Sequence, residues 1–208
     1  MSSETTPTLL RTGGQLLVDQ LVLHGVQHIF CVPGESYLAV LDALHDAPIA
    51  LTVCRQEGGA AMMAETHGKL TGRPGVCFVT RGPGATNAAA GVHIAMQDST
   101  PLLLFVGQIE RGARGREAFQ EVDYRAAFGP LAKWATEVDD ARRLPEIVAR
   151  AFSVACSGRP GPVVVALPED MLVERAEAPN ARPCQVIEAA PSPAQMAQLL
   201  ERLGQARN

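Results

Sequence analysis

The sequence predicts an α/β protein with three layers, in which helices cover both faces of a six-stranded, mostly parallel sheet. Short continuous apolar runs alternate along the chain with segments in which apolar residues recur every three or four positions. Glycine, proline or polar residues follow most of these runs before the next periodic segment begins. Strands that alternate with helices at this spacing form parallel βαβ units, whose sheet is buried on both faces.

The composition excludes several classes of protein. The chain has 208 residues, 47% hydrophobic and 19% charged, which suffices for one sizeable core. A net charge of -4 without a basic cluster argues against nucleic acid and membrane as partners. There is neither an apolar run of about 20 residues nor a signal-peptide pattern, so we expect a cytoplasmic protein. Five cysteines without C-x-x-C fit reduced thiols better than disulfides or zinc.

The first half of the chain contains three predicted strands and three helices. The strands cover residues 29–32, 49–53 and 75–80, and the helices cover about 12–23, 37–44 and the segment after Glu57 up to Gly72. Thr12 and Gln15 form a capping box for the first helix. Ser36 is expected to cap the second helix. In the third, small residues and methionine recur at helical spacing directly after an apolar run, so strand passes into helix almost without a loop.

The second half continues the pattern. Helices are predicted over about 85–97 and 144–155, and strands over 102–106, 134–138 and 162–167. The first of these helices is rich in alanine and glycine, which lets it pack close to the sheet, and the second is amphipathic and ends at Gly158. Between them, Gln108 to Lys133 loses periodicity and is as long as loops that are functional.

The organisation into domains is read from changes in composition. A polar tail covers residues 1–11 and is expected to be disordered, and the α/β domain covers 12–172. A proline- and alanine-rich connector over 173–191 is typical of a linker. Ser192 then opens an amphipathic helix within 192–208, which has no domain of its own to cover.

Three predicted loops meet at one edge of the sheet. They are Pro33-Gly34-Glu35-Ser36, Arg55-Gln56-Glu57-Gly58 and the segment Arg81 to Asn87, and each follows the carboxyl end of a strand, where parallel sheets bind ligands. Gly-Pro-Gly at 82–84 forms a rigid turn that admits a flat ring, whereas no Walker or G-x-G-x-x-G phosphate loop is present. Taken alone, Glu57 has an ordinary explanation, because acids in a first helical turn complement the helix dipole.

Six motifs, in order over residues 12–170, favour a functional role for Glu57 over this ordinary explanation. They are F-x-V-P-G at 30–34, E-x-x-A-A at 57–61, T-x-G-P-G-A-T-N at 80–87, D-S-x-P at 98–101, A-F-Q-E at 118–121 and G-R-P-G-P-V at 158–163. Together they resemble the N-terminal, pyrimidine-binding domain of thiamine diphosphate enzymes, above all the acetolactate synthase large subunit. The resemblance implies the flavodoxin-like thiamine diphosphate-binding fold.

The resemblance also implies roles for single residues. Glu57 is expected to hydrogen-bond ring nitrogen N1′ of the cofactor's aminopyrimidine and to act as the catalytic acid/base group. Phe119 and Gln120 are expected on the substrate side; the less favoured alternative for Gln120 is a surface residue of a long loop. His67 and His93 are expected to be packing residues, because neither has a partner at metal-ligand spacing. The expected cofactor-binding residues are Pro33, Gly34, Glu57, Thr80, Gly82, Pro83, Gly84 and Asn87.

The chain departs from the acetolactate synthase pattern in three places. Glu35-Ser36-Tyr37 stands where the enzymes that it resembles usually have small residues, Gln56 stands where they commonly have histidine, and Arg81 replaces a small residue. The substrate is therefore expected to be a 2-oxo acid or a related acyl donor rather than pyruvate in particular, and decarboxylation and ligation both remain open.

The chain lacks the other half of a thiamine diphosphate site. In the family a separate domain that begins with Gly-Asp-Gly holds the diphosphate and Mg²⁺, and no Gly-Asp-Gly occurs here. The resemblance thus implies that this chain binds only the pyrimidine half of thiamine diphosphate and binds no metal. It also implies a homodimer or higher oligomer, in which a diphosphate-binding domain of the same or another chain completes the site. The terminal helix resembles the start of the family's middle domain. The alternatives are a split subunit, a catalytically silent dimerisation module and, last, a flavodoxin-like nucleotide binder.

Overall fold

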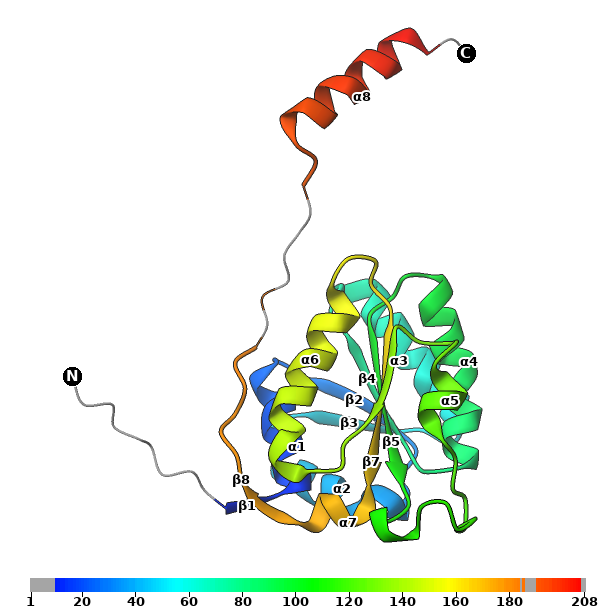
Figure 1. Cartoon of the computed structure of the whole chain (residues 1–208), viewed down its shortest axis with the longest axis vertical. Helices are drawn as coiled ribbons and strands as arrows, with labels where there is room; N and C mark the ends of the chain where they lie inside the picture. Colours follow the sequence, from blue (N-terminus) through cyan, green and yellow to red (C-terminus); the bar gives the residue numbers. More distant parts are fainter. Residues whose placement is uncertain (1–9, 184, 186–189, 207–208) are drawn as a thin grey trace, which may run out of the picture.

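The structure, a computed structural model, describes residues 10–183, 185 and 190–206. Its centre is a sheet of six parallel strands in the order β3-β2-β4-β5-β7-β6, which confirms the predicted class and number of strands (Figure 1). The strands are β2 (His28–Cys31), β3 (Ala50–Val53), β4 (Gly75–Val79), β5 (Leu102–Gln108), β6 (Trp134–Glu137) and β7 (Pro162–Pro168). Since every connection joins parallel strands, all six carboxyl ends lie at one edge of the sheet.

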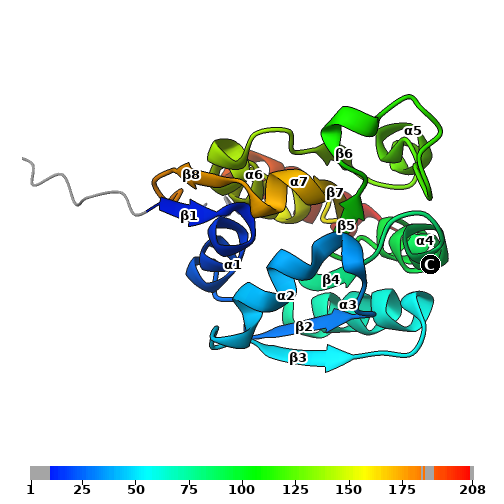
Figure 2. The same ribbon diagram turned by 90° about the horizontal axis from the view of Figure 1, so that it is seen from below.

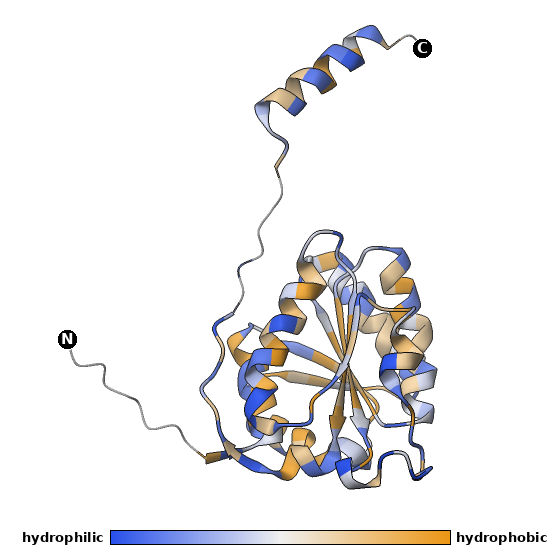
Figure 3. Cartoon of the chain, in the orientation of Figure 1, coloured by the Kyte–Doolittle hydropathy of each residue, from blue (hydrophilic) through white to orange (hydrophobic). Residues whose placement is uncertain are grey.

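Helices cover both faces of this sheet. One layer contains α1 (Gly13–Leu23), α2 (Leu38–His45) and α6 (Leu144–Cys156), and the other contains α3 (Glu57–Thr71), α4 (Pro83–Gln97) and α5 (Tyr124–Phe128). Figure 2, which shows the molecule from the end where the strands finish, separates the two layers on either side of the sheet. The apolar side chains of the strands face both layers, so the sheet is the most hydrophobic part in Figure 3.

The burial of three inner strands explains why the sequence predicts an α/β protein. Every residue of β4, β5 and β7 is buried, whereas the edge strands β3 and β6 are partly exposed. Burial on both faces requires continuous apolar runs, which is the pattern that the sequence displays. Phe78 of β4 and Phe105 of β5 stack in the middle of the sheet, with ring centroids 4.7 Å apart.

Local signals at helix termini were correct in part. The capping box of Thr12 and Gln15 is present at the start of α1. Ser36, however, does not cap α2, because residues Glu35–Tyr37 form a 3₁₀ turn and the buried Ser36 hydroxyl bonds Thr80 instead. Helix α4 begins at Pro83, two residues before the expected start, because proline is favoured in a first helical turn.

A second, two-stranded sheet was not foreseen. Strand β1 (Leu10–Thr12) pairs antiparallel with β8 (Arg175–Glu177), which follows α7 (Glu169–Val173). Leu10 and Arg11 fall in the expected tail and β8 falls in the expected linker, while residues 1–9 lie outside the described part. Strands β1 and β8 have three residues each, which is too few to show the apolar–polar alternation by which a strand is predicted.

The carboxyl-terminal segment contains one helix, α8 (Pro193–Gln205), among its described residues. Ser192 caps α8 through a capping box with Gln195, as its sequence suggests, and no residue of α8 is buried. In Figure 1, α8 stands apart from the three layers. No helix in the described part of the chain is long and apolar enough to cross a membrane.

Candidate functional site

Glu57 is the first residue of α3, and three residues separate it from the end of the edge strand β3. The side chain of Gln56 caps this helix, because its Oε1 accepts a hydrogen bond from the backbone N–H of Gly59 at 2.7 Å. The cap fixes the first turn and therefore the direction in which the carboxylate leaves the backbone. Glu57 is half-buried at the carboxyl edge of the sheet.

One carboxylate oxygen of Glu57 accepts a hydrogen bond within the chain, and the other is free to bond a ligand. The Nδ2 group of Asn87, on α4, donates a hydrogen bond to Oε2 at 3.0 Å. In the described part of the chain, Oε1 has no hydrogen-bond partner, and a Cβ atom added to Gly84 would lie 3.5 Å from it. The absence of a side chain at Gly84 thus keeps space open beside Oε1, and α3 and α4 together orient the carboxylate.

The turn at Gly82 requires glycine for two reasons. Its φ of 59° and ψ of −114° are disfavoured for residues with a Cβ atom, and such an atom would lie 2.7 Å from Cβ of Gln120. The backbone N–H of Gly82 donates to Oη of Tyr124 at 2.8 Å. Burial raises the pKa of Tyr124 to about 12, so this hydroxyl stays protonated at neutral pH.

The loops after β2 and β4 are in direct contact. A Cβ atom at Gly34 would lie 2.4 Å from Cβ of Thr80, so only glycine fits there. The hydroxyls of Ser36 and Thr80 are hydrogen-bonded at 2.8 Å, and the backbone N–H of Arg81 donates to Ser36 Oγ at 3.3 Å. These contacts hold the Pro-Gly turn against the strand that leads to Gly-Pro-Gly.

Arg81 joins three loops through an ion cluster. Its guanidinium donates to Glu169 Oε2 at 2.7 Å and to Glu35 Oε1 at 3.1 Å, while its side chain is only 10% exposed. Both carboxylates are considerably more exposed than the arginine. Two of the residues that depart from the family pattern, Glu35 and Arg81, are therefore ion-paired with each other, and Arg81 is shared with Glu169.

The residues expected at the site fall into two groups. Gly34, Thr80, Gly82, Gly84, Asn87 and Glu57 are linked by the contacts above. The backbone of Gln120 packs against Gly82, which places it near the turn, but the side chain of Phe119 is 74% exposed. Pro33 and Pro83 are also exposed.

The loop that carries Phe119 and Gln120 is tied together by one carboxylate. Glu121 accepts hydrogen bonds from the backbone N–H groups of Gly115, at 2.7 Å, and Ala118, at 3.1 Å. The bond from Gly115 is the main reason that the pKa of Glu121 lies below its ordinary value. Both Glu117 and Gln120 have positive φ angles, so the loop has a defined, turned conformation.

Sequence reasoning missed three supporting residues. Ser36 was taken for a helix cap, Tyr124 was not singled out, and Gln56 was noted only as a departure from a family pattern. Tyr124 is one of two tyrosines in the chain, and both are fully buried. A polar aromatic side chain in a weakly periodic loop was the available signal, since buried tyrosine usually has a hydrogen-bond partner.

The donor set fits the pyrimidine half of the expected cofactor. An oriented carboxylate with a free oxygen can bond a ring nitrogen, and the glycines beside it leave space for a flat ring. No group of three or more His, Cys, Asp or Glu that could hold a metal ion occurs within the described ranges.

Comparison with known proteins decides the family. A model of the thiamine pyrophosphate enzymes, for their N-terminal TPP binding domain, matches residues 11–127. The chain belongs to this family. It is a thiamine diphosphate-binding, N-terminal domain of the acetolactate synthase-like type, as its relatives indicate.

Several acetolactate synthases are similar to the chain over most of its length. The acetolactate synthase of Bacillus subtilis (strain 168) is 41% identical over 170 residues, which cover 82% of this chain and 30% of the relative. That of Arthrospira platensis is 44% identical over 164 residues, 77% of this chain and 28% of the relative. The isozyme 2 large subunit of Escherichia coli (strain K12) is 43% identical over 159 residues, 76% and 29%. The chain thus spans less than a third of the length of these relatives.

Proposed function

We propose that this chain supplies the pyrimidine half of a thiamine diphosphate site in an enzyme that decarboxylates or ligates 2-oxo acids. The observation that carries the proposal is the carboxylate of Glu57, fixed through Oε2 by Asn87 and open at Oε1 beside Gly84. Thiamine diphosphate supplies the electron-accepting chemistry that such reactions need. The chain's own part is to orient the pyrimidine and to move one proton.

Glu57 is the proposed acid/base group. Its Oε1 would hold a proton shared with ring nitrogen N1′ of the aminopyrimidine, which favours the cofactor's reactive tautomer. Asn87 donates to Oε2 and so keeps the carboxylate turned toward the ring.

The turns around Glu57 form the proposed wall for the pyrimidine. The residues assigned to it are Pro33, Gly34, Thr80, Gly82, Pro83, Gly84 and Asn87. The close approach of Gly34 to Thr80 and the bond from Gly82 to Tyr124 support a rigid wall, which limits the entropy lost when a ring binds.

Phe119 and Gln120 are proposed to face a 2-oxo acid substrate. Gln120 lies against Gly82, and the exposed ring of Phe119 is available to cover a ligand. Glu35 would disfavour an anionic substrate, and its ion pair with Arg81 weakens that effect. Arg81 is shared with Glu169, so the three groups together keep one negative charge.

The diphosphate and Mg²⁺ are proposed to bind a domain of the same or another chain, within a homodimer or larger oligomer. Large apolar side chains on the edge strand and on α3 support association. They are Leu51, Val53, Met62, Met63 and Leu70, all exposed. Cys31 and Cys77 are buried free thiols, in line with a reducing compartment such as the cytoplasm.

Exchange of Glu57 for glutamine tests the proposal. Glutamine keeps the size of the side chain but cannot take up a proton at Oε1. In an enzyme reconstituted with a diphosphate-binding domain, 2-oxo acid turnover should fall by at least ~10²-fold. Glu201→Gln, an exposed change on α8, serves as the control and should leave turnover as it is.

The outcome separates this function from its alternative. If Glu57→Gln turns over substrate at the wild-type rate, the chain acts without acid/base catalysis, as a silent association module would. The isolated 208-residue chain should bind thiamine diphosphate and Mg²⁺ weakly in calorimetry, because its charged anchor is supplied elsewhere.

A further inference from the structure

A cavity of about 490 Å³ lies at the opposite end of the sheet from Glu57. It opens where β2 and β4 begin, and its walls come from the turn between α1 and β2, the turn between α3 and β4, and α6. This volume is in the range of small-molecule sites. Neither the proposed cofactor site nor the proposed reaction uses any residue of this cavity.

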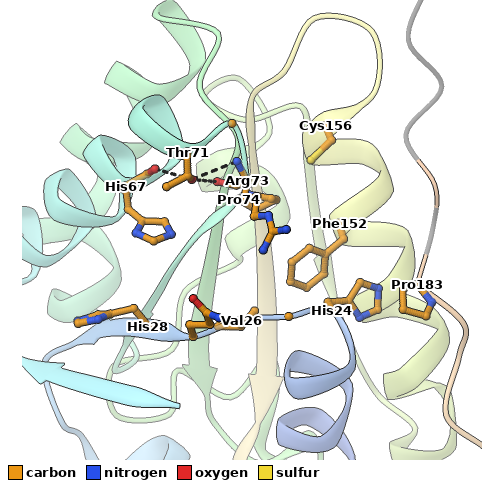
Figure 4. Close-up of a pocket in the computed structure, with 13 residues that line it drawn as sticks. His24, Val26, His28, His67, Thr71, Arg73, Pro74, Phe152, Cys156 and Pro183 are labelled. Carbon is orange, nitrogen blue, oxygen red and sulfur yellow. Dashed lines mark hydrogen bonds between the residues drawn. The ribbon is translucent and has the colours of Figure 1, made fainter. Parts of the chain in front are cut away.

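Arg73 is a positively charged residue of the cavity lining. It is the one charged side chain among the described residues that line it, and within the described ranges it forms no ion pair. Figure 4 shows its guanidinium extending into the space between His67 of α3 and Phe152 of α6. A guanidinium in this position can bind a planar carboxylate through two parallel hydrogen bonds.

Flat rings form the other wall. The imidazole of His24 stacks on Phe152, with ring centroids 4.3 Å apart and an angle of 20° between the planes. The stacked pair gives the cavity a flat wall, which is suited to a flat organic body.

Arg73 is the one permanently charged side chain among the described residues that line the cavity. Burial lowers the pKa of both His24 and His67, so these imidazoles are uncharged at neutral pH. His28, the third imidazole of the lining, donates to or accepts from Thr52 Oγ1 at 2.6 Å and extends away from Arg73 in Figure 4. One cation matches a monoanion better than a dianion such as phosphate.

We propose that this cavity binds a small planar monocarboxylate. Arg73 holds the carboxylate, and the flat body of the ligand lies against Phe152 and His24. Thr71 at the end of α3 also lines the cavity, while Glu57 is at the start of the same helix. An occupant would therefore contact the helix that carries the proposed acid/base group, about 20 Å away along the helix axis.

Titration of the 208-residue chain, followed by the NMR signals of its backbone amides, tests the proposal. Benzoate is the probe, benzamide is its neutral counterpart and inorganic phosphate is the dianionic one. Benzoate should produce saturable shifts at Val26, Gln27 and Gly72. Because a charged hydrogen-bonded pair is lost, benzamide should bind at least about tenfold more weakly, and so should benzoate to Arg73→Gln.

Two further variants make the result specific. Arg202→Gln removes an arginine charge from α8, outside the cavity, and should leave benzoate affinity unchanged. Arg73→Lys keeps the positive charge but lacks the paired donors of the guanidinium, so it should bind benzoate with intermediate affinity. A well-dispersed spectrum of Arg73→Gln establishes that the variant is folded. The proposal is overturned if benzoate gives no saturable shifts at these amides, if Arg73→Gln binds it like the wild type, or if phosphate binds more tightly.

Discussion

At the scale of single residues, Arg81 shows how a buried charge is accommodated beside the candidate site. The guanidinium is buried, whereas its partners Glu35 and Glu169 reach the surface. The cost of removing a charge should therefore depend on which member of the cluster is left behind. A buried charge without its partner is costly, while an exposed carboxylate recovers hydration by water.

This asymmetry predicts the effect of two exchanges on the free energy of unfolding. Arg81→Met should lower it by about 1 kcal/mol, because both remaining carboxylates are hydrated. Glu35→Gln with Glu169→Gln should lower it by about 3 kcal/mol, because the guanidinium stays buried without a counter-charge. Urea unfolding of both variants gives the comparison. Equal losses, or a larger loss for Arg81→Met, would rule out the stated reason.

At the scale of elements, the crossing of α3 and α4 sets the distance between Glu57 and Asn87. The helices touch where Gly91 faces Ala61, and a Cβ atom at Gly91 would lie 2.6 Å from Cβ of Ala61. No real pair of Cβ atoms is that close, so any larger residue must push the helices apart. The small residues that the sequence shows in these helices are therefore needed for the site as well as for packing.

Gly91→Ala should destabilise the domain although alanine favours helices. The expected loss is about 1 to 3 kcal/mol from overpacking, which exceeds the gain of about 1 kcal/mol in helix propensity. Thermal and urea unfolding measure it. Gly204→Ala is the matched control, since open space surrounds Gly204 on α8, and it should not lower the unfolding midpoint. A Gly91→Ala variant as stable as the wild type would mean that α3 and α4 can separate freely.

At the scale of the whole molecule, exposed apolar side chains lie on two surfaces of the part that the structure describes. One, on β3 and α3, includes Val53 and the 81% exposed Leu70, and the other is the stripe of α8, with Leu199 and Leu203. An unpaired edge strand beside exposed apolar side chains is a usual place for association. The first surface adjoins the proposed cofactor site, so it is the one that a completing partner is expected to cover.

Sedimentation of the 208-residue chain distinguishes the two surfaces. The chain should form dimers, and Met63→Lys with Leu70→Lys should shift them to monomers, because buried lysine charges oppose the contact. Leu199→Lys with Leu203→Lys should leave the dimer intact. The opposite pattern would assign association to α8 instead, and a monomeric wild type would refute self-association through either surface.

Much of the fold was readable from the sequence, for identifiable reasons. The central strands are buried on both faces, so their apolar runs are continuous, and the capping box at Thr12 and the helix start at Ser192 depend only on neighbours in the chain. Strands β1 and β8 were missed because three residues carry no period. The role of Ser36 was misjudged because a serine before a helix is an ordinary cap, and its true partner is 44 residues away.

The sequence by itself determined the α/β class, the order of the strands and helices along the chain, and the motifs that mark Glu57 and the Gly-Pro-Gly turn. Only the tertiary structure decided which of these residues touch. Asn87 meets Glu57 across 30 residues, and Arg81 meets Glu169 across 88. Hydrophobic periodicity is a local property of the chain, whereas hydrogen bonds and ion pairs between loops depend on strands being brought side by side. The cavity at Arg73 could not be predicted for the same reason, since its lining comes from four separate parts of the sequence, Pro183 among them.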